Sequence, residues 1–244
     1  MSVLPDPRPT AAKESVLVQQ MFDRVAPRYD LANTVFSLGQ DRHWRRVAAL
    51  AAGVEPGDRV LDLAAGTGAL GAELRQAGAW VVAADFSWNM LHAGAVRERE
   101  EPPVAGNLAW CGADALALPF PDAAFDAATI AFGLRNLGDT AGGVREMARV
   151  LRPGGRLVVC EFGLPTRPAL RAAYLRYLVG AMPLAARLLT SDPSAYRYLA
   201  ASIRAWPDQL SLAGLIAANG FQRVQWKNLT GGIVAVHRAV RLRR

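Results

Sequence analysis

The 244-residue sequence has few of the residues that build disulfides and metal sites, with two cysteines and three histidines. Cys111 and Cys160 fall inside predicted core strands and no C-x-x-C pair is present. We therefore expect buried thiols in a reducing cytoplasm. His43, His92 and His237 are scattered without the spacing of metal ligands, so we expect no metal centre. No apolar run is long enough to span a bilayer.

Lysine is also nearly absent, because Lys13 and Lys227 are the only two, and arginine supplies most of the net charge of +7. Basic proteins often bind nucleic acid or an anionic membrane surface. The arginines are spread along the chain without a dense block before residues 241–244. This distribution favours weak attraction to an anionic membrane and argues against a nucleic-acid groove. The composition does not indicate an oligomeric state.

The length suits one α/β domain with a large core. Residues 1–14 are proline-rich, do not resemble a signal peptide, and are predicted to form a flexible tail. Residues 15–244 are predicted to form a single domain, in which strands alternate with helices as in a doubly wound, mostly parallel sheet of seven strands. Two helical segments interrupt this alternation: an N-terminal cap at residues 15–53 and an insertion at residues 164–209 after the fifth strand.

The most informative segment is VLDLAAGTGALG at residues 60–71. A buried strand carries Asp62 into a turn built on Gly66, Thr67 and Gly68, and a helix follows. Free N–H groups at a helix N-terminus and a close approach of the backbone suit a nucleotide-like ligand. The spacing also satisfies G-x-G-x-x-G, so a dinucleotide and S-adenosylmethionine (SAM) both fit this segment alone.

Two further strand ends favour SAM. Asp85 ends the second strand, about twenty residues after the loop, where a carboxylate would bind ribose hydroxyls. After a strand at residues 108–111, Asp114 could accept from an adenine amino group and the Ala115 amide could serve the ring. Leu-Arg-Pro-Gly-Gly at residues 151–155 ends a helix and leads into a strand at residues 156–160. A dinucleotide would leave Asp114 and this turn unexplained. The set resembles a class I SAM-dependent methyltransferase.

The acceptor side carries no N/D-P-P-Y/F segment, which argues against an exocyclic nitrogen as the acceptor. After the fourth strand the chain instead reads FGLRN at residues 132–136. With this string the chain resembles the ubiquinone/menaquinone biosynthesis C-methyltransferase family, nearest its bacterial demethylmenaquinone branch, from Met21 to His237. The other matching strings are MFDRVAPRYDLAN, the segment at residues 37–44, LDLAAGTG, LPFPDAAFD, RVLRPGGRL, YRYLAASI, the Trp-Pro-Asp-Gln turn at residues 206–209, and NLTGGIVAVH. Departures include Asp41, where the family often has His, and Ala131, where it often has Ser.

This resemblance implies SAM-dependent methylation of a ring carbon of a prenylated naphthoquinol, demethylmenaquinol to menaquinol. A benzoquinol in ubiquinone biosynthesis, a natural-product quinone, an RNA or protein substrate, and SAM binding without quinol turnover are the alternatives. Arg135 and Asn136 are the expected catalytic residues, with Arg135 stabilising the phenolate. Tyr29, Asp30 and Asn33 are further polar candidates, although the first two could only hold the cap. The proton acceptor stays open among water, Asp30 and His43.

The insertion at residues 164–209 mixes Arg167, Arg171, Arg176 and Arg187 with leucine and tyrosine. Such a mixture is typical of a helical lid that touches an anionic membrane and admits a prenyl tail. A lid that merely packs on the sheet is the alternative. We therefore expect a cytoplasmic protein that docks transiently at the inner face of the cell membrane.

Overall fold

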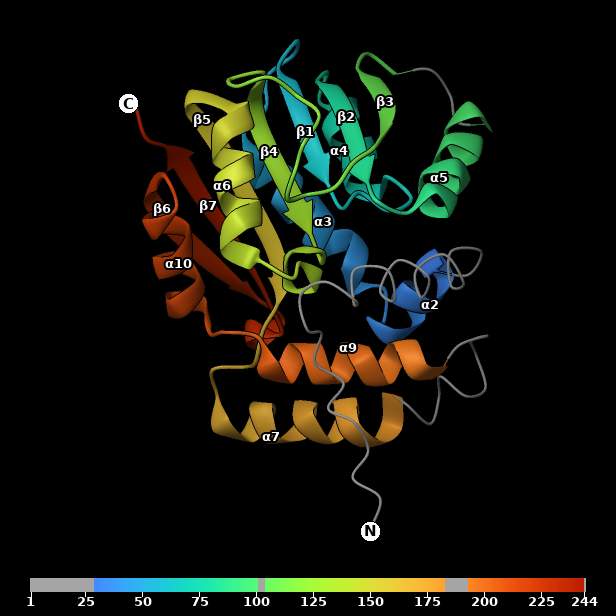
Figure 1. The fold of residues 1–244 in the computed structure, drawn as a ribbon. Coiled ribbons are helices and arrows are strands. Elements are labelled where there is room, and N and C mark those ends of the chain that lie inside the picture. Colours follow the sequence, from blue (N-terminus) through green and yellow to red (C-terminus); the bar gives the residue numbers. More distant parts are fainter. Residues whose placement is uncertain (1–28, 101–103, 183–192, 244) are drawn as a thin grey trace.

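A seven-stranded sheet forms the centre of the molecule (Figure 1). The computed structural model describes residues 29–100, 104–182 and 193–243. The strands are β1 (Arg59–Leu63), β2 (Trp80–Asp85), β3 (Asn107–Gly112), β4 (Phe125–Ala131), β5 (Leu151–Phe162), β6 (Phe221–Leu229) and β7 (Val234–Arg241). Their order is β3-β2-β1-β4-β5-β7-β6. Strand β7 pairs antiparallel with both β5 and β6, and all other pairs are parallel. The predicted doubly wound, mostly parallel sheet is confirmed.

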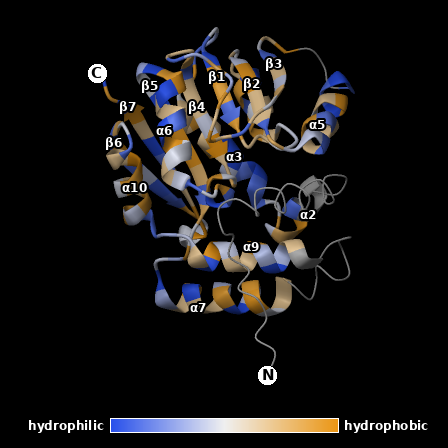
Figure 2. Ribbon diagram, viewed as in Figure 1, coloured by the Kyte–Doolittle hydropathy of each residue, from blue (hydrophilic) through white to orange (hydrophobic). Residues whose placement is uncertain are grey.

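Helices lie on both faces of this sheet and beyond one of its ends. They are α2 (Tyr29–Phe36), α3 (Gln40–Ala52), α4 (Ala69–Gln76), α5 (Trp88–Glu100), η2 (Leu134–Asn136), α6 (Thr140–Val150), α7 (Pro168–Arg176), η3 (Tyr177–Ala181), α9 (Pro193–Ala205), α10 (Gln209–Ala218) and η4 (Thr230–Gly232). Helices α3 and α4 bury their apolar stripes in one core cluster, whereas α6 and α10 contribute to the cluster on the opposite face. In Figure 2 the strands between these layers are largely orange, as expected for a sheet buried on both faces.

The residues after β5 form a separate layer. Helices α7 and α9 lie side by side beyond the end of the sheet at which β1 and β4 terminate (Figure 1). A third apolar cluster joins α7, η3 and α9, and it includes Tyr174, Leu178, Tyr196 and Ile203. The segment starts where the Gly163 amide donates to the Ile233 carbonyl at 2.9 Å. It ends at α10, where the Gln209 carbonyl lies 2.9 Å from Nε2 of His237 on β7. One end of the segment is therefore bound to the residue directly before β7, and the other end to β7 itself.

Two details differ from the expectations, and two expected segments lie wholly or partly outside the described residues. Strand β5 begins at Leu151 and not at residue 156, because Leu151 already pairs with Phe125 and the Pro-Gly-Gly turn forms an irregularity within the strand. Cys160 is buried as expected, but Cys111 is only half-buried. The predicted tail at residues 1–14 and the first part of the cap, up to residue 28, lie outside the described residues.

Candidate active site

The loop between β1 and α4 adopts a conformation that depends on glycine. Gly66 and Gly68 have φ values of 57° and 75°, and Gly68 directly precedes the first residue of α4. A Cβ atom on Gly68 would lie 2.4 Å from the indole ring of Trp110. Because both a left-handed backbone and close packing are required, only glycine fits this position without strain. The loop thus presents the N-terminus of α4 at the carboxyl end of the sheet, as the sequence predicted.

Asp62 is a buried carboxylate directly before this loop, with only 1% of its surface exposed. Its Oδ1 accepts from the Thr129 hydroxyl at 2.7 Å. Its Oδ2 has no hydrogen-bond partner in the described part of the chain. Burial raises the pKa of Asp62 from 3.8 to about 7, although the Thr129 hydroxyl, the nearby Gly71 amide and the Arg45 charge oppose this rise. An incompletely satisfied buried carboxylate of this kind suits a cationic ligand.

Asp85 organises the loop from the end of β2. One carboxylate oxygen accepts from the Gly66 amide and the other from the Ser87 amide, each at 2.8 Å. Arg97 on α5 donates to the Thr67 carbonyl at 2.6 Å, which holds the loop from another side. Asp85 is 6% exposed and therefore lies just under the surface.

Asp114 and Ala115 follow β3 and complete the row of strand ends. The Ala113 amide donates to the Asp85 carbonyl at 2.9 Å, which keeps this segment beside β2. Asp114 is exposed and its Oδ1 accepts from the Leu116 amide at 2.9 Å, while Ala115 is buried. The predicted cofactor residues therefore occupy neighbouring strand ends of one sheet edge. A small cavity of about 30 Å³ lies at the loop, and Asp62, Gly66 and Thr67 are among the residues that line it.

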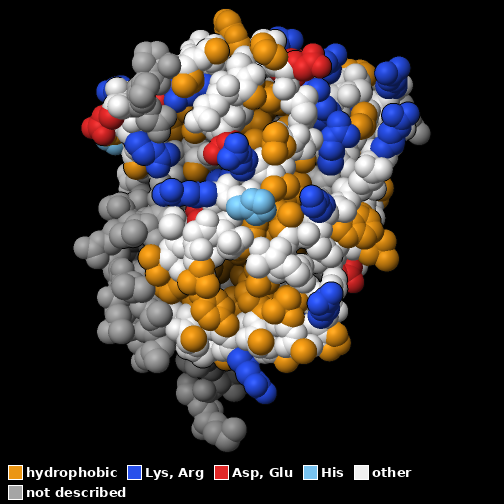
Figure 3. Space-filling model, turned by 180° about the vertical axis from the view of Figure 1, so that it is seen from behind, with side chains coloured by type: hydrophobic (Ala, Val, Ile, Leu, Met, Phe, Trp, Pro, Cys, Tyr) orange, Lys and Arg blue, Asp and Glu red, His pale blue; other side chains and the backbone are white. Residues whose placement is uncertain are grey.

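A larger cavity of about 380 Å³ lies between α2, α3, the ends of β4 and β5, and the helical layer of α7, η3 and α9, which is called the lid below. Its lining residues are Asn33, Phe36, Ser37, Leu38, Gln40, Asp41, Trp44, Arg45, Phe132, Arg135, Phe162, Leu170, Ala173, Tyr174, Tyr177, Leu178, Met182, Ala195, Tyr196, Tyr198, Leu199, Ile203, Thr230 and Ile233. Seen from behind, hydrophobic side chains surround a hollow at the height of the lid (Figure 3). Arg45 and Phe132 line both cavities, so the two spaces adjoin.

The two ends of the larger cavity differ in chemistry. Charged groups come from α3 and from the turn after β4, namely Asp41, Arg45 and Arg135. The lid contributes mostly apolar and aromatic groups, such as Leu178 and Met182. A ligand with a polar ring and an apolar tail would match this division.

Arg135 lines the larger cavity, but most of its donors already have partners. Its Nη1 lies 2.7 Å from Oε1 of Glu161 and also donates to the Phe132 carbonyl, and its Nε donates to Ser202 at 3.3 Å. The side chains of Arg135 and Glu161 are 6% and 1% exposed, which makes this a buried ion pair. The predicted catalytic cation is therefore also a structural one, held in place by a carboxylate that the sequence reading did not assign.

Asn136 stands further from the cavity than expected. It is absent from the residues that line either cavity in the described structure. Its Oδ1 accepts from the hydroxyl of Tyr198 at 3.2 Å, and Tyr198 does line the larger cavity. Of the other polar candidates, Asn33 lines this cavity, whereas the side chains of Tyr29 and Asp30 lie outside the described residues. Asn136 is therefore connected to the cavity indirectly, by its hydrogen bond with Tyr198.

Two tyrosines of the lid face the same cavity as proton donors. Burial raises the pKa of Tyr174 far above its usual value near 10 and also raises the pKa of Tyr177. The Tyr177 hydroxyl donates to the Phe36 carbonyl at 2.9 Å, which ties the lid to α2. Both phenols stay protonated at physiological pH, so neither can act as a base there.

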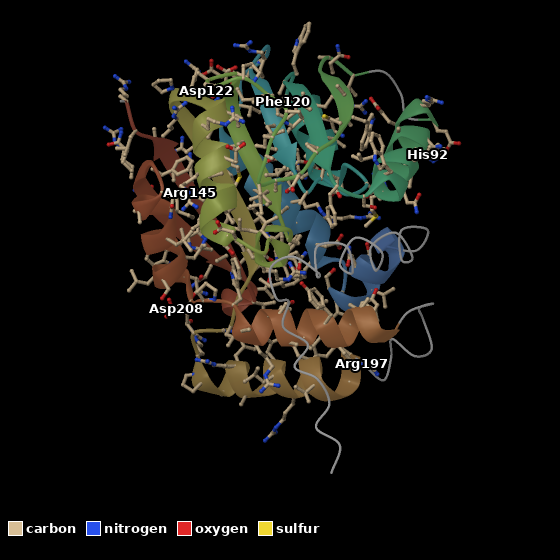
Figure 4. All side chains as sticks on the ribbon, in the orientation of Figure 1. His92, Phe120, Asp122, Arg145, Arg197 and Asp208 are labelled. Atoms are coloured by element: carbon tan, nitrogen blue, oxygen red, sulfur yellow. The ribbon has the colours of Figure 1, made fainter. Side chains whose placement is uncertain are left out.

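The residues that sequence reasoning missed lie at the start of α3. Ser37, Asp41 and Arg45 follow one another at intervals of four residues and are connected. The Ser37 hydroxyl donates to Oδ1 of Asp41 at 2.9 Å, and Nη1 of Arg45 lies 2.6 Å from Oδ2 of Asp41. The i, i+4 spacing of an acid and a base was the available signal. His43, in contrast, is exposed, and His92 lies on α5, far from the lid (Figure 4).

Solved structures share this architecture. The [4+2]-cyclase SpnF matches with a TM-score of 0.69 at 18% identity, over 96% of this chain and 98% of that one. Haemonchus contortus phosphoethanolamine N-methyltransferase 2, solved in complex with SAM, matches with a TM-score of 0.57 at 17% identity, over 80% of this chain and 52% of that one. The sheet and the similar solved structures define a class I methyltransferase fold. One of these structures is a cyclase, so the fold alone does not specify the reaction.

Sequence comparison is more specific. The model of the ubiE/COQ5 methyltransferase family matches residues 9–241. A demethylmenaquinone methyltransferase from Mycobacterium sp. (strain KMS) is 58% identical over 234 residues, which cover 96% of this chain and 98% of that protein. A second, from Mycolicibacterium vanbaalenii, is 56% identical over 96% of this chain and 99% of that protein. This chain belongs to the ubiE/COQ5 methyltransferase family, and it is a SAM-dependent methyltransferase.

The described ranges contain no helix long and apolar enough to cross a membrane. Within the same ranges, no three or more His, Cys, Asp or Glu side chains gather as metal ligands would.

Proposed function

We propose that this enzyme transfers the methyl group of SAM to a ring carbon of demethylmenaquinol and so forms menaquinol. The observation that supports this most directly is the cavity of about 380 Å³ that adjoins the glycine loop and has charged groups at one end and apolar groups at the other. A quinol ring would occupy the charged end and the start of a prenyl tail would lie among the lid residues. The relatives at 58% and 56% identity are demethylmenaquinone methyltransferases, which agrees with this substrate.

The proposed cofactor site consists of Asp62, Gly66, Thr67, Gly68, Asp85, Asp114 and Ala115. The unpartnered Oδ2 of Asp62 supports this assignment, because SAM carries a cationic sulfonium and an ammonium group that a buried carboxylate would attract. When bound, SAM supplies the electrophilic methyl group. Asp85 ends β2 and holds the loop through the Gly66 amide, where ribose hydroxyls would approach it, and Asp114 stands at the rim for the adenine.

Asp85 provides a direct test of this placement. We expect Asp85→Ala to weaken SAM binding at least about ten-fold in calorimetry, since a hydrogen bond to a charged acceptor contributes roughly 1.5–3 kcal/mol. Unchanged affinity in a variant with an intact fold would place the cofactor elsewhere.

We infer that Arg135 forms part of the wall around the quinol ring and that Asn136 supports this wall from outside. Arg135 holds a positive charge against the ring of Phe162, with 5.1 Å between the guanidinium carbon and the ring centroid. A fixed cation near a phenol favours its ionised form, and an electron-rich phenolate ring attacks a methyl electrophile more readily. Asn136 would act on the ring indirectly by orienting the Tyr198 hydroxyl.

The reaction itself decides between the candidate acceptors. Purified enzyme is incubated anaerobically with SAM and chemically reduced demethylmenaquinone, and in parallel with a demethylated benzoquinol of the same prenyl length. We expect mass spectrometry to find the naphthoquinone product heavier by one methylene. Turnover of the benzoquinol alone would transfer the assignment to ubiquinone biosynthesis. SAM binding without methylation of either ring would contradict the proposed function.

We further propose that the rim of the cavity docks on an anionic membrane. Leu38 and Leu170 line the cavity and yet are 88% and 38% exposed, so they mark its mouth. Exposed Arg167, Arg171 and Arg176 stand on or beside α7. In Figure 4 Arg197, on α9, adds a further cation at this end of the molecule. A tail too long for the cavity would leave through such a mouth into lipid.

Vesicle co-sedimentation tests this surface. We expect binding to vesicles that contain phosphatidylglycerol, weaker binding to pure phosphatidylcholine, and a loss of binding as salt rises. Leu38→Asp should reduce binding, whereas the matched change Leu50→Asp should not, because Leu50 is 74% exposed at the other end of α3 and lines neither cavity. Binding that ignores lipid charge, salt and Leu38 would contradict membrane docking and leave the proposed reaction intact.

A further inference from the structure

We propose that Asp41 accepts the phenolic proton of the quinol and that Arg45 stabilises the phenolate formed. This inference rests on the proposed function and adds two catalytic residues to it. Both side chains line the larger cavity and are nearly buried, with exposures of 7% for Asp41 and 12% for Arg45.

The position of Arg45 supports the assignment. Among the described residues, Arg45 and Phe132 alone line both the cavity at the glycine loop and the larger cavity. A methyl group that passes from SAM to a quinol must cross where these two spaces adjoin. The guanidinium carbon lies 5.8 Å from the centroid of the Phe132 ring, a distance at which a cation is attracted to the ring face. Arg45 is therefore the cation at the junction of the two spaces.

The pairing of Arg45 with Asp41 supplies a place for the proton. Asp41 holds Nη1 of Arg45 on Oδ2 at 2.6 Å and the Ser37 hydroxyl on Oδ1 at 2.9 Å. When a quinol hydroxyl gives its proton to Asp41, the acid becomes neutral and the charge of Arg45 is balanced by the new phenolate. The net charge of the cavity does not change in this step. A largely apolar cavity makes such conservation of charge favourable, because an added net charge would be costly there.

The other titratable groups that face the pair do not compete with Asp41 as the proton acceptor. On the lid, Tyr174 and Tyr177 have raised pKa values and remain donors. Across the cavity, Arg135 is paired with Glu161. At the glycine loop, Asp62 has a pKa of about 7 and belongs to the proposed SAM site. Variants are therefore compared by kcat at saturating SAM. Under this condition the titration of Asp62 in the SAM-free enzyme does not enter the measured rate.

The complete reaction balances. The quinol O–H bond breaks and its proton passes to Asp41. The ring carbon next to that oxygen forms a bond with the methyl carbon, and the electron pair of the broken methyl–sulfur bond remains on sulfur. The ring carbon then loses its hydrogen as a proton to water, which restores aromaticity. The ring oxygen regains a proton from Asp41. One proton is released for each methyl group transferred.

The test measures kcat anaerobically with reduced demethylmenaquinone at saturating SAM. We expect Asp41→Asn to lower kcat about 100-fold or more near neutral pH, since a positioned base contributes roughly 10²–10⁴-fold. SAM affinity should stay within about two-fold of the wild type. The rate of the variant should rise about ten-fold per pH unit towards the phenol pKa near 10, because hydroxide then ionises the quinol. Asp41→Glu, which keeps a carboxylate, should restore part of the rate.

Asp139→Asn is the matched control. Asp139 is also a carboxylate in an ion pair, with Arg145 at 3.3 Å, but it caps α6 on the other face of the sheet and lines neither cavity. Figure 4 shows Arg145 there, far from the lid. We expect this variant to keep the wild-type kcat and pH profile.

Arg45→Gln is the second test of the proposal and replaces Asp41→Asn if that variant does not fold. It should also lower kcat about 100-fold, and in the double variant the losses should not multiply, because the two residues act as a unit. An Asp41→Asn or Arg45→Gln enzyme with kcat within about ten-fold of the wild type overturns the assignment, as does a pH profile parallel to the wild type. A wild type that binds SAM but leaves the quinol unmethylated overturns the proposed function and this inference together.

Discussion

Replacing Asp62 by Asn should stabilise the free enzyme while it weakens the binding of SAM. Burial raises the pKa of this carboxyl from 3.8 to about 7. Below about pH 4 the group is protonated in both the folded and the unfolded protein and contributes nothing. As pH rises towards 7 the unfolded chain loses the proton first, so the free energy of unfolding falls. Above pH 7 the full cost is present, and three pKa units correspond to at most about 4 kcal/mol.

Asn removes this cost but adds a smaller one. Its oxygen can still accept from the Thr129 hydroxyl, as Oδ1 of Asp62 does at 2.7 Å. Its amide then replaces Oδ2, an atom without a partner among the described residues, and an unsatisfied buried donor costs about 1–3 kcal/mol. The net gain at pH 8 is therefore about 1–3 kcal/mol, or roughly 2–4 °C in Tm for each kcal/mol in a protein of this size. The gain should disappear near pH 5.

Thermal unfolding of the free enzyme from pH 5 to 8, with calorimetry of SAM binding over the same range, measures both effects. Because the ionised carboxylate is the form that attracts a cation, wild-type affinity should rise with pH and level off above about pH 7. Affinity of the Asp62→Asn enzyme should be lower and nearly independent of pH. Asp208→Asn is the control: Asp208 caps α10 at the surface, where bonds from Ser211 lower its pKa, and its replacement should not raise Tm (Figure 4). A less stable Asp62→Asn protein at pH 8, or SAM affinity that varies equally with pH in both enzymes, would refute this reasoning.

Two more substitutions probe the loop and the buried ion pair. Gly68→Ala should abolish SAM binding and lower Tm, because φ is 75° and the new Cβ would lie 2.4 Å from the Trp110 ring; Gly180→Ala, where nothing lies within 4 Å, should change neither quantity. Arg135→Ala should lose most of kcat and also about 3–5 kcal/mol of stability in denaturant unfolding, because it leaves the buried Glu161 unpaired. Adding Glu161→Gln should recover much of that stability but not kcat; recovery of both would assign Arg135 a structural role only.

The arrangement of the glycine loop and of the carboxylates at the strand ends could be predicted from sequence because its signals are local. A strand, a loop with required glycines and a helix follow one another at residues 60–71, and parallel strands bring Asp62 and Asp85 to one edge. Sheet topology follows from the same alternation of strands and helices. These inferences need no knowledge of how distant segments pack.

The acceptor side depends on such packing and was predicted only in part. Glu161 was not assigned as the partner of Arg135, because the two are 26 residues apart and meet only when β5 pairs with β4. Asp41 and Arg45 were not assigned a role, because nothing local shows that α3 turns this face towards the sheet end and the lid. Asn136 was expected at the cavity, yet a tyrosine from α9 stands between. Contacts between the cap, the sheet and the lid set all three outcomes.

One end of the lid is bound to Ile233, directly before β7, and the other end to His237 on β7. The chain therefore leaves and re-enters the methyltransferase framework at neighbouring points, and the intervening residues can be exchanged as a cassette. In evolution, the preferred tail length can diverge by replacement of this one cassette while the glycine loop and the charged end of the cavity stay constant. A chimera that carries the lid of a relative with a different isoprenoid would inherit the tail preference of the donor. The same geometry makes this enzyme a suitable scaffold for engineered quinone methylation.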